Sequence, residues 1–146
     1  MDKVSVYLDN CCYNRPYDNQ TQIRVRLETQ AKLHIQKLIV EKKINLVYSY
    51  ISVYENLKNP DITRRLSITD FFNHAAVFVD TSKSDKVTEI AAQIIETGVK
   101  KMDALHVASA IIGKADYFLT TDIRLLKYST DKIHIINPID FSISEV

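Results

Sequence analysis

Four acidic side chains in this chain are placed where they could act together. Asp9 and Asp122 each follow a short apolar run, and Glu55 and Asp103 lie in stretches with a helical pattern. Four carboxylates in one crevice would repel one another strongly at neutral pH unless a cation lay between them. Carboxylate oxygens favour Mg²⁺ or Mn²⁺ over zinc. The residue types therefore predict a site for a hard divalent metal ion.

Such a site would suit the hydrolysis of a phosphodiester. One or two bound ions can activate a water molecule and stabilise the attacking and leaving oxygens, as in many nucleases. The structural alternative is that the acids cap helices, because carboxylates at helix starts accept hydrogen bonds from free backbone N–H groups. The choice depends on whether the fold brings the four acids together.

The acids are positioned by an alternation of strands and helices. Apolar, β-branched or aromatic runs predict buried strands, and apolar residues at intervals of three and four predict helices. We expect strands at 4–8, 44–48, 77–79, 117–120 and 133–136, and helices at 18–42, around 53–57, and at 62–76, 85–97 and 101–113. This order predicts an α/β fold with three α/β/α layers and a central, mostly parallel sheet. Ligands of such sheets bind at the carboxyl ends of strands, where Asp9 and Asp122 lie.

Two of the predicted helices have further features. On the longest helix, 18–42, we expect one face to be buried, formed by Ile23, Leu27, Ala31, Ile35 and Leu38 or Ile39. The helix at 101–113 is rich in Ala and closed by Gly, which predicts close packing against the sheet.

The length of 146 residues fits one domain, so we expect residues 1–146 to form a single unit. No apolar run approaches the ~20 residues of a membrane span, and the N-terminus lacks the pattern of a signal peptide. We therefore expect a cytoplasmic protein.

The adjacent Cys11 and Cys12 cannot easily form an unstrained disulfide with each other and lack zinc-site spacing, so we expect them to be packing residues.

Four blocks of sequence surround the four acids: VYLDNCCYN with Asp9, YSYISVYEN with Glu55, KKMDALHVASAI with Asp103, and ADYFLTTDIRLL with Asp122. Together they resemble a PIN domain, the small metal-dependent ribonuclease fold of VapC-like toxins in bacterial toxin–antitoxin pairs. The likeness spans nearly the whole chain. The last two blocks are the most specific, because an Asp-Ala-Leu-His-x-Ala-x-Ala helix is followed closely by a strand that ends in Thr-Thr-Asp.

The resemblance implies a metal-dependent endoribonuclease, the toxin of a type II toxin–antitoxin pair, which cleaves RNA with water activated by Mg²⁺ or Mn²⁺. Asp9, Glu55, Asp103 and Asp122 match the acidic positions that hold the metal and carry the catalysis, and Thr120 matches a nearby hydroxyl position. The resemblance also implies an RNA substrate, a small antitoxin partner and a homodimer.

Two positions depart from the family pattern. Many members carry Ser or Thr directly after the first Asp, where this chain has Asn10, and some carry a further acid after the last one, where it has Ile123 and Arg124. These departures leave open whether one or two metal ions bind.

Other polar residues have two interpretations each. His106 lies on the same helical face as Asp103. It is expected either to act directly, by contact with a phosphate or by proton transfer, or to support the acids by packing behind them. Asn10 is expected either to orient Asp9 or the substrate, or to cap the strand end. Further candidates for RNA contact, as phosphate ligands or stacking rings, are Arg15, Arg24, Arg26, Lys100, Lys101, Arg124, Tyr13 and Tyr17.

Two other functions compete with the nuclease. A non-catalytic PIN-like module would bind RNA or a protein without cleaving it, although the intact set of acids disfavours this. A phosphoacceptor receiver-like domain is also a small parallel α/β fold. It needs an acidic pair after its first strand and an acceptor Asp after its third, where this chain has Asp9-Asn10 and Asp80.

Overall fold

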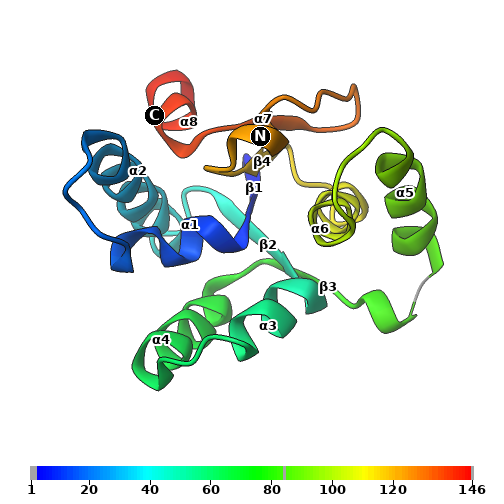
Figure 1. Ribbon diagram of the computed structural model, residues 1–146. Helices are drawn as coiled ribbons and strands as arrows, with labels where there is room; N and C mark the ends of the chain where they lie inside the picture. The colour runs from blue at the N-terminus through cyan, green and yellow to red at the C-terminus, as the bar shows by residue number, and fades with distance from the viewer. Residues whose placement is uncertain (1–2, 84, 146) are drawn as a thin grey trace.

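A five-stranded parallel sheet forms the centre of the computed structural model, which describes residues 3–83 and 85–145 (Figure 1). The strands are β1 (Ser5–Leu8), β2 (Asn45–Ser49), β3 (Val77–Val79), β4 (Tyr117–Leu119) and β5 (His134–Ile136). Their order is β3-β2-β1-β4-β5, and all neighbours are parallel. The predicted α/β class and the five predicted strands are confirmed, with each strand end within one residue of its predicted place.

Helices connect the strands and follow the last one. They are α1 (Asn10–Asn14), α2 (Ile23–Val40), α3 (Tyr50–Leu57), α4 (Ile62–Phe71), α5 (Asp85–Glu96), α6 (Lys101–Ile112), α7 (Ile123–Leu126) and α8 (Pro138–Glu145). Single turns of 3-10 helix occur at Arg15–Tyr17, Phe72–His74 and Thr81–Lys83. The sequence pattern predicted α2 to α6 but missed α1 and α7, because helices of five and four residues do not show a full apolar period. It also missed α8, which begins at Pro138 directly after β5.

Helices cover both faces of the sheet. Val6 and Leu8 of β1 pack in one core with residues of α1, α2, α4 and α8, whereas Tyr7 points to the opposite face and packs in a second core with α5 and α6. Figure 1 shows α5 and α6 on one side of the strands and α2 and α8 on the other. The predicted three-layer α/β/α arrangement is therefore confirmed.

Helix α6 lies very close to the sheet, as its Ala-rich sequence predicted. Ala104, Ala108 and Ala110 are fully buried. A Cβ atom on Gly113 would lie 2.5 Å from Val47 Cγ1, a separation that real side chains do not tolerate. Small residues thus fix the position of the helix that carries Asp103 and His106.

The buried face of α2 differs from the prediction at its N-terminal end. Ile23 is 65% exposed and Leu27 is 47% exposed, whereas Glu28 is fully buried. The C-terminal part of the predicted face is buried as expected, at Ala31, Ile35, Leu38 and Ile39. The prediction was wrong at Ile23 and Leu27 because ion pairs of Glu28, described below, turn that carboxylate toward the interior.

The order of the strands excludes the receiver-like alternative. In a receiver-like sheet, with strand order 2-1-3-4-5, the first and third strands are neighbours. Here β2 lies between β1 and β3, so Asp80 follows an edge strand and is not next to Asp9.

In the described residues, every helix is too short or too polar to cross a bilayer.

Candidate active site

Asp9 lies at the carboxyl end of β1 and is held firmly there. It is 5% exposed, and its backbone N–H donates to the Leu119 carbonyl over 2.9 Å, which joins the ends of β1 and β4. Its Oδ1 accepts a hydrogen bond of 2.8 Å from the Asn10 backbone N–H, and its Oδ2 accepts one of 2.8 Å from Thr120 Oγ1. Both carboxylate oxygens are therefore oriented by neighbouring groups.

The Thr120 hydroxyl connects two of the four acids. It donates to Asp9 and accepts a hydrogen bond of 3.1 Å from the Asp122 backbone N–H. Asp122 in turn caps α7, since its Oδ1 accepts from the Arg124 N–H over 2.9 Å. Because β1 and β4 are neighbouring parallel strands, Asp9 and Asp122 lie at the same edge of the sheet, as predicted.

Glu55 reaches this edge from α3, whose start is fixed by a capping box. The Ser49 hydroxyl accepts from the backbone N–H groups of Ile51 and Ser52, and the Ser52 hydroxyl accepts from the Ser49 N–H. The helix therefore begins directly after β2. Glu55 lies in its second turn, where its carboxylate meets His106.

A buried chain of hydrogen bonds connects Glu55 to β1. His106 Nε2 forms a short hydrogen bond with Glu55 Oε1, and His106 Nδ1 lies 2.6 Å from the Tyr7 hydroxyl. That hydroxyl also lies 2.7 Å from Ser49 Oγ and 3.1 Å from Ser52 Oγ. His106 is only 1% exposed, which favours the supporting role over direct contact with a phosphate.

The protonation of His106 follows from its surroundings. Burial opposes the charged form, but Tyr7, the hydrogen bond to Glu55 and the charge of Asp9 together raise the pKa of His106 to about 10. Both ring nitrogens are engaged, Nδ1 by the Tyr7 hydroxyl and Nε2 by Glu55. In its protonated form, which the raised pKa favours, His106 places a positive charge beside the acids.

The four acids fall into two groups, one around His106 and one on the wall of a cavity. Ligand atoms of Asp9, Glu55 and His106 lie within 4.8 Å of one another. Asp103 and Asp122 line an adjoining cavity of about 440 Å³. Burial, followed by the negative charges of Asp9, Asp122 and Glu55, raises the pKa of Asp103, so the four carboxylates influence one another.

This donor set fits a hard divalent cation. Because His106 is engaged at both nitrogens, the atoms available to a metal are carboxylate oxygens, which Mg²⁺ and Mn²⁺ prefer. Burial is the main cause of the raised pKa of Asp103, and a bound cation would relieve the repulsion that Asp9, Asp122 and Glu55 add to it. The residues that would hold it are Asp9, Glu55, Asp103 and Asp122.

Comparisons with known proteins bear on the fold. No family model and no curated protein matches the sequence. Two solved structures are similar to this chain. FitAcB from Neisseria gonorrhoeae has 19% sequence identity and a TM-score of 0.59, and the match covers 91% of this chain and 97% of that chain. VapBC2 from Rickettsia felis, bound to a DNA fragment from its promoter, has 16% sequence identity and a TM-score of 0.56, and the match covers 92% of this chain and 98% of that chain. This chain has a PIN-like fold. The likeness extends over nearly the whole length of each chain.

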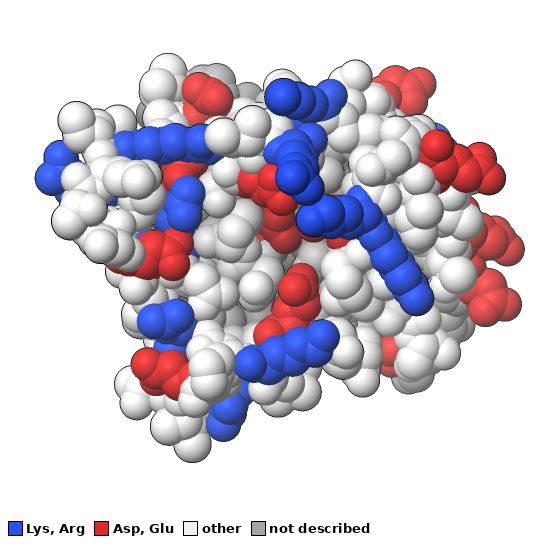
Figure 2. Space-filling view, viewed as in Figure 1, with Lys and Arg blue, Asp and Glu red and all other residues white. Residues whose placement is uncertain are grey.

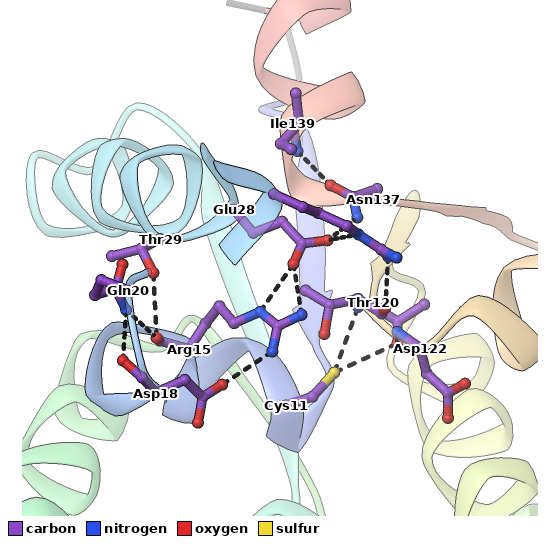
Figure 3. Close-up of polar contacts among 12 residues, drawn as sticks. Cys11, Arg15, Asp18, Gln20, Glu28, Thr29, Thr120, Asp122, Asn137 and Ile139 are labelled. Atoms are coloured by element: carbon purple, nitrogen blue, oxygen red, sulfur yellow. Dashed lines mark hydrogen bonds and ion pairs between the residues drawn. The ribbon is translucent and has the colours of Figure 1, made fainter. Parts of the chain in front are cut away.

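The PIN-like domain contains a second buried polar cluster that the sequence analysis missed (Figure 3). The Glu28 carboxylate accepts from Arg15 Nε over 2.8 Å, from Arg24 Nε over 3.0 Å and from Asn137 Nδ2 over 2.5 Å. Arg24 Nη2 also donates to the Thr121 carbonyl over 2.9 Å. Through Arg24 the cluster thus holds the carbonyl of Thr121, which lies between Thr120 and Asp122.

Several residues expected to contact RNA have other roles in this domain. Arg15 and Arg24 are bound to Glu28, so they are not free phosphate ligands. Tyr13 is 2% exposed and its ring packs edge-on against Phe71 and Phe72, so it is a core residue. The four-residue spacing of Arg24 and Glu28 was the one local signal for the buried cluster.

The residues after Asp9 also have defined places. Cys11 and Cys12 are free thiols, as expected, and Cys12 is fully buried. Cys11 Sγ lies 3.4 Å from Asp9 Oδ2, so this thiol packs against the first acid. The Asn10 side chain accepts a hydrogen bond from Asn14 Nδ2, and the Asn10 backbone N–H donates to Asp9 Oδ1. Asn10 therefore supports the strand end through its backbone N–H.

Proposed function

We propose that this PIN-like domain is a metal-dependent endoribonuclease and the toxin of a type II toxin–antitoxin pair. The observation that carries the proposal is the geometry of Asp9. Its two oxygens are oriented by Asn10 and Thr120, and its carboxylate lies within 4.8 Å of a ligand atom of Glu55 at the carboxyl edge of the sheet. Helix capping alone does not explain this convergence, because Glu55 lies in the second turn of α3.

The roles of the acids follow from their positions. Asp9, Asp103 and Asp122 would hold Mg²⁺ or Mn²⁺, and Glu55 would either hold it or position the attacking water. When bound, the ion would supply an activated water and stabilise charge on the phosphodiester. Thr120 fixes one oxygen of Asp9. His106 holds one oxygen of Glu55 and offsets part of the negative charge.

The toxin assignment draws on the fold neighbours. VapBC2 was solved bound to a DNA fragment from its promoter. By analogy we propose a cytoplasmic protein that acts on RNA, forms a homodimer and is inhibited by a small antitoxin encoded next to it. A non-catalytic PIN-like module that binds RNA or a protein is the second candidate, and the retention of all four acids disfavours it.

The nuclease proposal is tested with purified protein and labelled single-stranded RNA. We expect cleavage with Mg²⁺ or Mn²⁺ and none after chelation by EDTA. Asp122→Asn should lower the rate by at least about 100-fold, in the range seen when a group that stabilises the transition state is removed. The matched control is Asp131→Asn, which removes an exposed carboxylate between α7 and β5. Cleavage by Asp122→Asn at the parent rate would refute the assignment.

The toxin proposal needs a separate experiment in cells. Induced expression of the parent chain should arrest growth, and Asp9→Asn, expressed to the same level, should not. Co-expression of the small protein encoded next to the gene should restore growth. Equal growth arrest by the parent and Asp9→Asn would contradict a toxin that acts through this site.

A further inference from the structure

A cavity lined by two of the four acids has the composition of a nucleotide site. It has a volume of about 440 Å³ and lies between residues 97–100, which join α5 to α6, and residues 124–129 of α7 and the following loop. This volume falls in the range of about 300–1,000 Å³ typical of small-molecule sites. Asp103 and Asp122 form part of its wall, so any group bound there adjoins the candidate metal ligands.

Three cations line the same cavity: Lys100, Arg124 and Lys127. All three are exposed, and within residues 3–83 and 85–145 none of them lies within 4.0 Å of a carboxylate oxygen in an ion pair. Figure 2 shows Lys and Arg side chains around the carboxylates at the centre of this face. By contrast, Arg15 and Arg24 are occupied by Glu28.

The remaining wall is partly apolar. Val99 and Tyr128 are half-buried, Leu125 is buried, and all three line the cavity. An aromatic ring beside free cations is the combination that binds unpaired bases and their phosphates, since the ring contacts a base while the cations contact the backbone. A purely acidic peptide would use the cations but not the ring and the apolar wall, so competition with poly-glutamate distinguishes the two ligands.

We propose that this cavity binds the nucleotide next to the scissile phosphate of a single-stranded RNA. Lys100, Arg124 and Lys127 contact its phosphates, and Tyr128 contacts its base. The assignment rests on the proposed nuclease function, because it identifies the substrate contacts of that same site. It explains why Lys100, Arg124 and Lys127 line the same cavity as Asp103 and Asp122: the carboxylates would hold the metal while the cations contact the flanking backbone.

The test is binding of a fluorescein-labelled 12-nucleotide oligouridylate to the intact protein, measured by fluorescence anisotropy in EDTA between 50 and 200 mM salt. The variant Lys100→Gln/Arg124→Gln/Lys127→Gln should bind at least about tenfold more weakly. Its plot of log affinity against log salt should be shallower by about 2, because each lost phosphate contact on a single strand removes about 0.7 from the slope. Tyr128→Ala should bind about 5- to 150-fold more weakly, from the about 1–3 kcal/mol of one base–aromatic contact.

The matched control is Lys37→Gln/Lys114→Gln/Lys132→Gln, which removes three exposed lysines that do not line the cavity. Equal affinity and equal salt slope for the two triple variants would overturn the proposal, as would failure of the parent to bind RNA. Displacement of the oligouridylate by a poly-glutamate peptide as efficiently as by unlabelled RNA would show a general anion site and also overturn it. Cleavage is assayed separately, so a failure of the nuclease proposal would be distinguishable from a failure of this one.

Discussion

Replacement of Thr120 by Val should weaken both the fold and the metal site. The Thr120 side chain is fully buried, and Val has nearly the same shape, so the change removes a hydroxyl without creating a large cavity. Three contacts of the hydroxyl are lost: the hydrogen bond donated to Asp9 Oδ2 over 2.8 Å, the one accepted from the Asp122 N–H over 3.1 Å, and a weak one of 3.5 Å with Cys11 Sγ. Each loss affects a group at the candidate metal site.

The magnitude follows from the type of each bond. A hydrogen bond to a charged group contributes about 1.5–3 kcal/mol, and a buried N–H left without a partner costs about 1–3 kcal/mol. Because Asp122 is only half-buried, water can replace part of the second bond. We therefore expect the free energy of unfolding to fall by about 2–4 kcal/mol, and the affinity for Mn²⁺ to fall by about 10- to 100-fold, as for other groups that orient metal ligands.

The assays are urea denaturation for stability and calorimetric titration with Mn²⁺ for affinity. Thr121→Val is the matched control, because it makes the same change at the next residue, whose side chain is not seen in a hydrogen bond within the described ranges. The reasoning would be refuted if Thr120→Val and Thr121→Val had equal effects on both measurements.

Three further predictions concern other parts of the molecule. Burial lowers the pKa of Lys32 to about 8 from about 10.5, so the folded chain binds fewer protons at this group than the unfolded chain between these pH values. The parent should therefore gain stability relative to Lys32→Met as the pH rises from 8 to 10.5, by up to about 3 kcal/mol in the free energy of unfolding. Urea denaturation at several pH values measures this, and a difference between the two proteins that does not change with pH would contradict it. Glu28→Gln should lower stability by about 3 kcal/mol, because Arg15 and Arg24 lose their buried counter-charge, and a melting temperature equal to that of the parent would oppose this interpretation. The double variant Cys11→Ser/Cys12→Ser should keep its RNA cleavage rate within a few-fold of the parent, and loss of cleavage in a folded variant would show that a thiol takes part.

The main strands and the edge that gathers the acids could be predicted from the sequence because their signals are local. A short apolar run followed by Asp indicates a buried strand and its carboxyl end, as at Asp9 and Asp122. The close contact of α6 with the sheet was also visible in its small residues, and Gly113 confirms it. These features depend on neighbours along the chain, so pattern and spacing were sufficient.

The two buried polar networks could not be predicted because their partners are distant in the sequence. Glu28 is buried only because Arg15 and Asn137 reach it, and Asn137 is 109 residues away. Tyr7 reads as an apolar strand residue, yet its hydroxyl meets His106, which is 99 residues away. Helical periodicity alone therefore placed Ile23 and Leu27 inside and Glu28 outside, and tertiary ion pairing reversed that order.

The most direct test of the central claim, that the acids hold a divalent cation that drives RNA cleavage, is the cleavage rate of labelled single-stranded RNA as a function of Mn²⁺ concentration for the parent and Asp9→Asn. We predict a rate that rises from zero in EDTA to saturation for the parent, and no saturable rise for Asp9→Asn. Cleavage by the parent in EDTA, or identical Mn²⁺ dependence for both proteins, would contradict the claim.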